Sequence, residues 1–146
     1  MKIAIVVSQF NKEISENLVE GAFDTYKKNS YDLDDISVFE VPGAFEIPFF
    51  IKKILAKKHN DYDAIIAFGS VIKGETAHFE FISKTVTDGI MNLSINNSFN
   101  IPILYGILTT YDYSQALERS MLNKKNKGGE VMQATLDLLK TINKLK

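Results

Sequence analysis

Four short runs of apolar, mostly branched residues alternate with longer segments in which apolar residues recur every three or four positions. The runs comprise residues 3–7, 36–41, 64–68 and 101–108. Their length, composition and bounding turn residues are typical of strands buried on both faces. The periodicity between them is typical of amphipathic helices. The sequence therefore predicts four strands that alternate with helices.

Each predicted helix has one apolar stripe. In chain order the stripes of the longer helices comprise Ile14, Leu18, Val19, Ala22, Phe23 and Tyr26; Ile51, Ile54 and Leu55; Ile82, Val86, Ile90 and Leu93; and Val131, Ala134, Leu138, Ile142 and Leu145. Pro48 suits the first turn of the second of these helices. Residues 114–121 predict a shorter helix, and the glycine-containing stretch 124–129 predicts a break before the last one.

This alternation determines the expected architecture. Strands joined through helices form right-handed crossovers, so the sheet should be mainly parallel with helices on both faces. The expected fold class is α/β, a three-layer sandwich with a four-stranded, mainly parallel sheet. A chain of 146 residues with 45% apolar content can fill one core. Residues 1–146 are therefore predicted to form a single domain.

Charge and composition restrict the partners. A net charge of −1 gives no electrostatic reason to expect nucleic acid or an anionic membrane, so small molecules are favoured. The absence of cysteine excludes disulfides, thiolate catalysis and cysteine-based zinc sites. With two histidines and no histidine-carboxylate cluster, no metal site is predicted. The apolar run after Met1 is too short for a signal peptide or membrane span, so we expect a cytoplasmic protein.

Ligands of parallel sheets bind beyond the carboxyl ends of the strands, which places the expected site on four loops. These loops comprise residues 8–11, 42–46, 70–78 and 109–114. The third loop is the most informative, because Gly69, Lys73, Gly74 and His78 separate an apolar strand from a helix. Backbone N–H groups at a helix start favour an anion, and histidine transfers protons near neutral pH. We therefore predict that this loop binds an anion beside His78, which would carry protons.

Three residues of these loops allow two interpretations each. Phe10 lies between polar neighbours and fits either stacking on a planar ligand or packing. Phe45 fits either a ligand contact or a hydrophobic staple for the following helix. Glu46 fits either an acceptor for sugar-like hydroxyls or a favourable charge at the helix start.

The basic side chains also have alternative interpretations. His78 fits either a general base or a residue that caps or packs the helix start. His59 follows two lysines at a solvated helix end and is predicted to lie on the surface. Arg119 and Lys127 fit ordinary solvated helix charges. The glycine loop matches neither the Walker nor the Gly-x-Gly-x-x-Gly pattern, which disfavours those modes of nucleotide binding.

Six sequence blocks, spread over nearly the whole chain, resemble the motifs of the lumazine synthase family. They are SQFN at 8–11, VPGAFEIP at 41–48, GSVIKGETAHF at 69–79, GILT at 106–109, QALER at 115–119 and NKG at 126–128. The resemblance implies a flavodoxin-like fold and an enzyme of riboflavin biosynthesis. This family condenses 5-amino-6-(D-ribitylamino)uracil with 3,4-dihydroxy-2-butanone 4-phosphate to 6,7-dimethyl-8-ribityllumazine, without cofactor or metal.

The same resemblance implies residue roles. The pyrimidine and its ribityl chain would be held by Phe10, Asn11, Ala44, Phe45, Glu46, Val71, Ile72 and Tyr105. The phosphate would be held by Gly74, Glu75, Thr76, Arg119 and Lys127. His78 would move protons. The resemblance further implies a ring of five subunits, in which Tyr105, Arg119 and Lys127 come from the neighbouring subunit.

The chain departs from the family pattern at two positions. Tyr105 replaces the usual phenylalanine, so its hydroxyl must find a polar partner or solvent. Glu75 stands where many members have alanine or glycine, and its carboxylate must point away from a bound phosphate. Assembly beyond a pentamer and docking to a riboflavin synthase stay open.

Two other functions are compatible with part of this residue set. A noncatalytic flavin- or lumazine-binding assembly would need Phe10, Phe45 and Glu46 but neither His78 nor Arg119. A flavodoxin-like electron carrier would hold FMN and be yellow when purified. The presence of all five residues favours the synthase.

Overall fold

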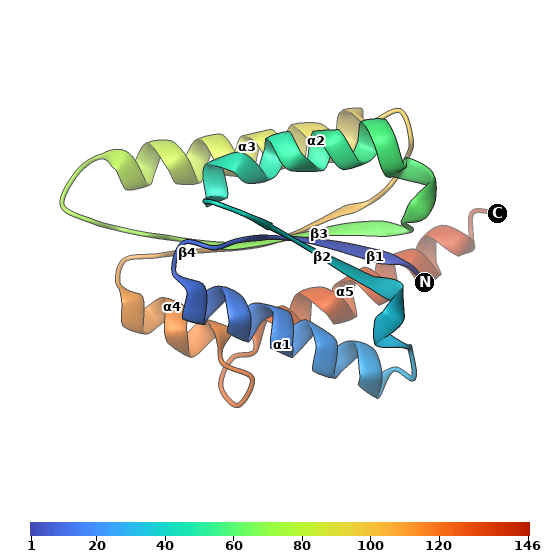
Figure 1. The fold of residues 1–146 in the computed structure, drawn as a ribbon, viewed down its shortest axis with the longest axis horizontal. Coiled ribbons are helices and arrows are strands. Elements are labelled where there is room, and N and C mark those ends of the chain that lie inside the picture. The colour runs from blue at the N-terminus through green and yellow to red at the C-terminus, as the bar shows by residue number, and fades with distance from the viewer.

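Four parallel strands form one sheet in the order β2-β1-β3-β4 (Figure 1). The computed structural model describes residues 1–146 and places the strands at Ile3–Ser8 (β1), Ile36–Val41 (β2), Ala64–Ile72 (β3) and Ile103–Thr110 (β4). All neighbouring pairs run parallel. This is the start of the flavodoxin-like strand order, in which the sheet grows first to one side of β1 and then, through β3, to the other. The predicted parallel sheet is confirmed.

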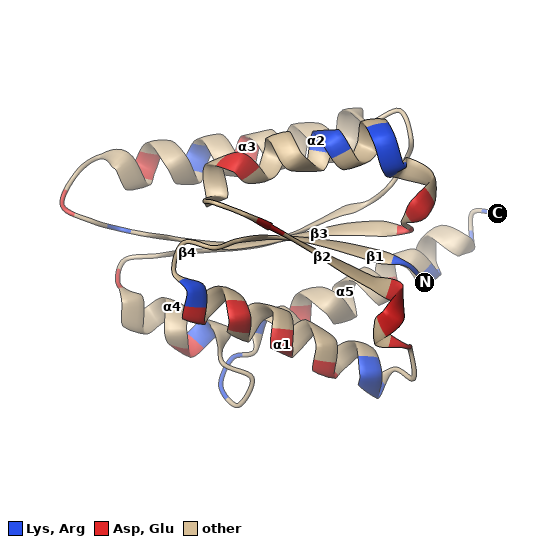
Figure 2. Cartoon of the chain, viewed as in Figure 1, with Lys and Arg blue, Asp and Glu red and all other residues tan.

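Helices cover both faces of this sheet. They are α1 (Lys12–Lys28), α2 (Ile47–Lys58), α3 (His78–Asn96), α4 (Tyr113–Ser120) and α5 (Lys127–Asn143). Helices α2 and α3 lie on one face, and α1, α4 and α5 lie on the other (Figure 1). The three-layer α/β sandwich is therefore confirmed. Basic and acidic residues are interspersed over both helical layers (Figure 2), in keeping with a net charge of −1.

The strand residues alternate between two apolar cores. Ile3 and Ile5 point toward α1 and α5, whereas Ala4 and Val6 point toward α2 and α3. Every residue of β1 is buried, and so are all residues of β3 except Ile72 at its end. Burying one such isoleucine contributes about 1.5–3 kcal/mol. These two central strands hold the loops at their carboxyl ends in fixed positions.

The edge strand β2 was predicted to be buried, and this was wrong. Only Val41 of β2 is buried, and 38% of the Val38 side chain is exposed. The reason is topological, because β2 pairs with β1 alone and has no second neighbour.

The end of β3 was also predicted incorrectly. Residues 70–72 were expected in a loop, but they extend the strand and pair with β4 as far as Ile72 opposite Thr110. Hydrogen bonding to β4 outweighs the weak strand propensity of glycine and serine at positions 69 and 70. The loop that precedes α3 is therefore limited to residues 73–77.

Helix α5 starts earlier than expected and buries a different face. Gly128 and Gly129 lie in its first turn, where a Cβ on Gly128 would be 1.9 Å from the carbonyl oxygen of Leu18 in α1. The glycines are thus required for close helix packing and do not mark a break. The buried face comprises Gly128, Gly129, Val131, Met132, Thr135, Leu136 and Leu139. Of the predicted stripe only Val131 is buried, because α1 contacts the side of α5 that carries the glycines.

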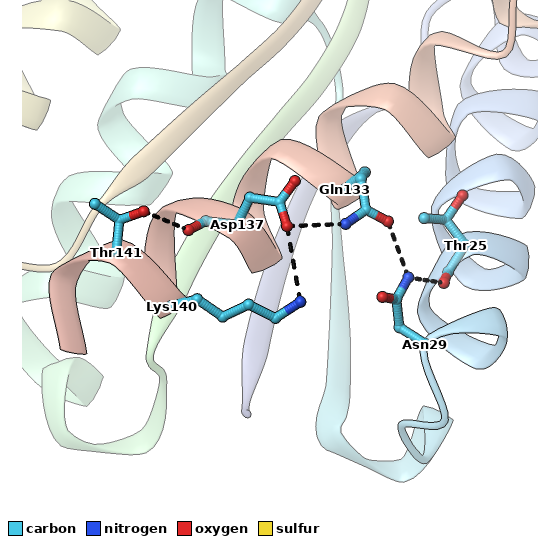
Figure 3. A network of polar contacts seen from close by, with 6 residues as sticks. All are labelled: Thr25, Asn29, Gln133, Asp137, Lys140 and Thr141. Atoms are coloured by element: carbon cyan, nitrogen blue, oxygen red, sulfur yellow. Dashed lines mark hydrogen bonds and ion pairs between the residues drawn. The ribbon is translucent and has the colours of Figure 1, made fainter. Parts of the chain in front are cut away.

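A polar network on the surface also joins α1 to α5 (Figure 3). The Asn29 amide donates to the carbonyl oxygen of Thr25 at 2.9 Å and to Gln133 Oε1 at 3.0 Å. Gln133 in turn donates to Asp137 at 3.0 Å. The network continues the contact that the glycines begin.

His59 is not the solvated side chain that the sequence suggested. It is half-buried, and its ring stacks on Phe99 with centroids 3.9 Å apart. A ring nitrogen lies 3.2 Å from the carbonyl oxygen of Leu55. The contact could not be foreseen because Phe99 belongs to the distant segment between α3 and β4.

No helix of the chain is both long and apolar enough to cross a bilayer.

Candidate active site

A cleft of about 680 Å³ opens at the carboxyl ends of the strands, where the sheet extends to either side of β1. Ligands of this fold class bind at such a switch point. The lining residues are Phe10, Asn11, Pro42, Gly43, Ala44, Phe45, Glu46, Ser70, Val71, Ile72, His78, Ile82 and Tyr113. The structure thus brings together most of the residues predicted to bind the pyrimidine, together with the predicted proton carrier.

The turn after β1 presents Phe10 to this cleft. The Phe10 backbone N–H donates to the carbonyl oxygen of Pro42 at 3.1 Å, which fixes the turn against the next loop. Asn11 adopts a left-handed conformation with φ of 59°, a region that asparagine tolerates well. Its side-chain amide donates to Ser70 Oγ at 3.2 Å and so bridges β1 and β3. The Phe10 ring is 72% exposed, so within one chain it does not pack in the core and is free for stacking.

Glu46 is oriented by the loop that precedes α2. Its Oε2 accepts a hydrogen bond from the Gly43 backbone N–H at 2.9 Å, and its own N–H donates to the Gly43 carbonyl at 3.2 Å. Pro48 lies in the first turn of α2, as predicted. The neighbouring Phe45 ring is 57% exposed, which argues against a hydrophobic staple. The free oxygen of Glu46 remains available to accept hydroxyl hydrogens.

The predicted anion loop lies beside the cleft. Its first residue, Lys73, donates its backbone N–H to the carbonyl oxygen of Thr110 at 2.9 Å. Gly74, Glu75 and Thr76 are exposed and do not line the cleft in a single chain. His78 is the first residue of α3, as predicted, and it does line the cleft. His78 thus lies in the cleft, whereas the three loop residues lie outside it.

The structure does not bring Tyr105, Arg119 and Lys127 into this cleft. Arg119 donates to the carbonyl oxygen of Gln115 at 3.1 Å, and Lys127 pairs with Glu130 at 2.8 Å. The Tyr105 hydroxyl lies 2.8 Å from Thr87 Oγ1, which supplies the polar partner that its departure from phenylalanine requires. These are the three residues for which the sequence predicted a place on a neighbouring subunit.

Five lining residues were not predicted: Pro42, Gly43, Ser70, Ile82 and Tyr113. Four of them lie in recognised motifs or on a predicted helix stripe, so their position was available as a signal. Tyr113 lies in the loop 109–114 that was expected to border the site, but no motif singled out its side chain. The Tyr113 hydroxyl donates to Glu13 Oε2 at 2.7 Å, and this hydrogen bond raises the pKa of the phenol above its ordinary value.

A second hollow of about 460 Å³ lies between α1 and the β2 edge. It is lined by apolar Val19, Phe23 and Val38 and by acidic side chains that include Glu16 and Glu20. It contains neither a histidine nor a glycine loop. No group of three or more His, Asp or Glu side chains is placed to hold a metal ion anywhere in the chain. Of these two hollows, the first is the one that contains a histidine and the residues predicted to bind substrate.

Comparison with known proteins identifies the family of the chain. The family model described as 6,7-dimethyl-8-ribityllumazine synthase matches residues 1–143. The chain belongs to this family. A 6,7-dimethyl-8-ribityllumazine synthase from Limosilactobacillus reuteri (strain DSM 20016) is 45% identical over 138 residues, which cover 94% of this chain and 87% of the relative. The predicted family is therefore confirmed. A de novo designed Rossmann fold protein is 11% identical to this chain, and the match covers 80% of this chain and 91% of that protein with a TM-score of 0.39.

Proposed function

We propose that this chain is a transferase of riboflavin biosynthesis. It condenses 5-amino-6-(D-ribitylamino)uracil with 3,4-dihydroxy-2-butanone 4-phosphate to 6,7-dimethyl-8-ribityllumazine, with release of phosphate and water. The main support for this proposal is the match of the family model to residues 1–143. The cleft supports it, because an exposed aromatic ring, a carboxylate and a histidine meet at the switch point. No observation favours a noncatalytic flavin- or lumazine-binding assembly.

The pyrimidine and its ribityl chain occupy the cleft in this proposal. Phe10 stacks on the uracil ring, and stacking on an aromatic side chain contributes about 1–3 kcal/mol per base. Asn11 and the segment Ala44–Glu46 hold the ribityl hydroxyls, with the free oxygen of Glu46 as an acceptor. Val71 and Ile72 border the ring on the β3 side.

The phosphate site is shared between subunits in this proposal. Gly74, Glu75 and Thr76 form a loop before α3, where backbone N–H groups favour an anion. Arg119 and Lys127 supply positive charge from the neighbouring subunit, which also contributes Tyr105. The support is that none of these three side chains lines the cleft of its own chain.

A ring of five subunits accounts for this division. A single chain exposes large apolar side chains on α3, with Phe81 71%, Met91 59% and Ile95 71% exposed. Such side chains on one helix are typical of a surface that another chain covers.

Three further expectations stay predictions. They are a cytoplasmic location, a single domain over residues 1–146 and docking to a riboflavin synthase.

The proposed reaction proceeds through additions and eliminations. The uracil amine attacks the ketone carbonyl, and loss of water gives an imine. Phosphate is then eliminated, and the ribitylamino nitrogen closes the second ring with loss of another water. His78 accepts and returns protons during these steps. The reaction includes no net oxidation or reduction, so it needs no external oxidant or reductant. We propose that no cofactor takes part.

Positioning should contribute more to the rate than proton transfer. Holding two reactants in a reactive geometry lowers the barrier by about 7–11 kcal/mol. One acid-base residue accelerates a reaction by about 10²- to 10⁴-fold, or about 3–5 kcal/mol. The cleft offers several binding groups, whereas His78 is the one histidine that lines it. Orientation of the two substrates is therefore the main source of catalysis.

The test is a direct assay. Purified protein is mixed with both substrates while lumazine absorbance and phosphate release are followed, and the mass of the assembly is measured in solution. We expect equal amounts of lumazine and phosphate from an oligomer. Binding of lumazine without any turnover would contradict the proposed reaction and favour the noncatalytic assembly.

A further inference from the structure

The cleft has one aromatic side chain to which neither the sequence nor the family match assigned a role, namely Tyr113. It is the first residue of α4 and lies beyond the carboxyl end of β4. Its side chain lines the same cleft as Phe10 and Asn11 and is 43% exposed. We propose that Tyr113 is a substrate-binding residue, whose phenol oxygen accepts a hydrogen bond from the ribityl-substituted pyrimidine.

The acceptor role follows from the partner of the phenol. The Tyr113 O–H donates to Glu13 Oε2 at 2.7 Å, so its one hydrogen is already engaged. The oxygen keeps lone pairs that can accept a further hydrogen bond. The raised pKa of the phenol, caused first by this hydrogen bond to Glu13, keeps the proton in place. A ligand group that meets Tyr113 must therefore be a donor.

This requirement distinguishes the two substrates of the proposed function, on which the inference rests. The pyrimidine carries an amino group, ring N–H groups and ribityl hydroxyls, all of which can donate. The butanone phosphate has a single free hydroxyl that could donate, and its phosphate dianion offers acceptors alone and would be repelled by the nearby Glu13 carboxylate. Tyr113 is thus assigned to the pyrimidine and away from the phosphorylated ketone.

Both ends of this contact are held in place before any ligand binds. The Asp112 side chain accepts a hydrogen bond from the Gln115 N–H at 2.8 Å, and Gln115 Oε1 accepts one from the Tyr111 N–H at 3.0 Å. These bonds fix the conformation of the chain at the start of α4, and α4 packs beside α1 (Figure 1). Glu13 lies in the first turn of α1, two residues after Asn11. Such preorganisation reduces the entropy lost on binding.

The test compares Tyr113→Phe with the wild-type assembly. Removal of the hydroxyl should raise KM for the ribitylaminouracil about 2- to 10-fold, the range for one hydrogen bond. KM for the butanone phosphate and kcat should stay within about twofold of wild type, because the lost contact serves one substrate equally in its ground and transition states.

Tyr111→Phe provides the matched control, since Tyr111 lies two residues before Tyr113, is 71% exposed and does not line the cleft. Unchanged KM values in Tyr113→Phe would overturn the inference. Equal rises for both substrates with a lowered Tm would also overturn it, because they would indicate a structural role. Absence of turnover by wild-type protein would instead contradict the proposed function. Calorimetric binding of ribitylaminouracil alone to wild type and Tyr113→Phe then decides whether Tyr113 contacts the pyrimidine.

Discussion

Two variants that damage different halves of the proposed site should restore activity when they share one assembly. Phe10 lines the cleft within its own chain, whereas Arg119 lies outside that cleft. If each site lies between subunits, Phe10→Ala and Arg119→Ala act on the two different sides of every site. A site that joins an intact Phe10 to an intact Arg119 should then form in mixed rings.

The size of the effect follows from this division. Loss of stacking costs about 1–3 kcal/mol, and loss of a hydrogen bond to a charged group costs about 1.5–3 kcal/mol. Well below KM, each single variant should therefore retain between about a fifth and a hundredth of wild-type activity. Equal amounts of the two variants, assembled at random in closed rings, give about a quarter of sites with both residues intact. The mixture should thus show about a quarter of wild-type activity.

The assay uses coexpressed chains with different tags, and native mass spectrometry verifies that rings contain both. Lumazine absorbance is followed at low concentrations of both substrates. As a matched control, the double variant Phe10→Ala/Arg119→Ala is mixed with wild type. A shared site gives about a quarter of wild-type activity in this control, whereas a site within one chain gives about a half. Verified mixed rings of the single variants that are no more active than the average of the two would refute the shared site.

Three further changes have expected outcomes. His78→Ala should lower kcat by no more than about 10²- to 10⁴-fold, since positioning supplies the larger part of the rate; complete loss in an intact assembly would contradict this. Gly128→Ala should lower the free energy of unfolding by about 1–3 kcal/mol or more in urea titrations, because its Cβ would lie 1.9 Å from the Leu18 carbonyl oxygen, whereas Gly74→Ala meets no atom within 4 Å and should have little packing cost. Burial raises the pKa of Tyr26 from 10.0 to about 12, so its contribution to stability should be complete below pH 10.0 and be lost as the pH rises through about 12. In Tyr26→Phe this alkaline loss, measured by denaturant titration at several pH values, should be absent.

The central part of the fold could be predicted from the sequence because it depends on local pattern. Strands β1 and β3 are buried on both faces, and their unbroken apolar runs record this directly. The stripe on α1 is equally clear, with Ile14 and Leu18 fully buried. The expected parallel sheet also predicted that the loop motifs would meet at the carboxyl ends of the strands.

Other features depend on contacts between distant segments and left no local signal. The buried face of α5 is determined by Gly128 against Leu18, so its most regular apolar stripe is not the one that packs. Tyr113 lies in the loop 109–114 that was expected to border the site, but no motif indicated that its side chain would line the cleft. The proposed roles of Arg119 and Lys127 need a second chain. Residue types alone could indicate their chemistry but not the subunit whose site they serve.

The open side of β2 has a consequence for the solution behaviour of the chain. An edge strand presents unpaired backbone N–H and C=O groups that can template pairing with another molecule and so promote aggregation. Charged side chains on such a strand oppose this, and β2 carries Glu40, whose carboxylate accepts a hydrogen bond from the Gln9 amide at 3.0 Å. A charged side chain at this position is expected to oppose edge-to-edge pairing of single chains.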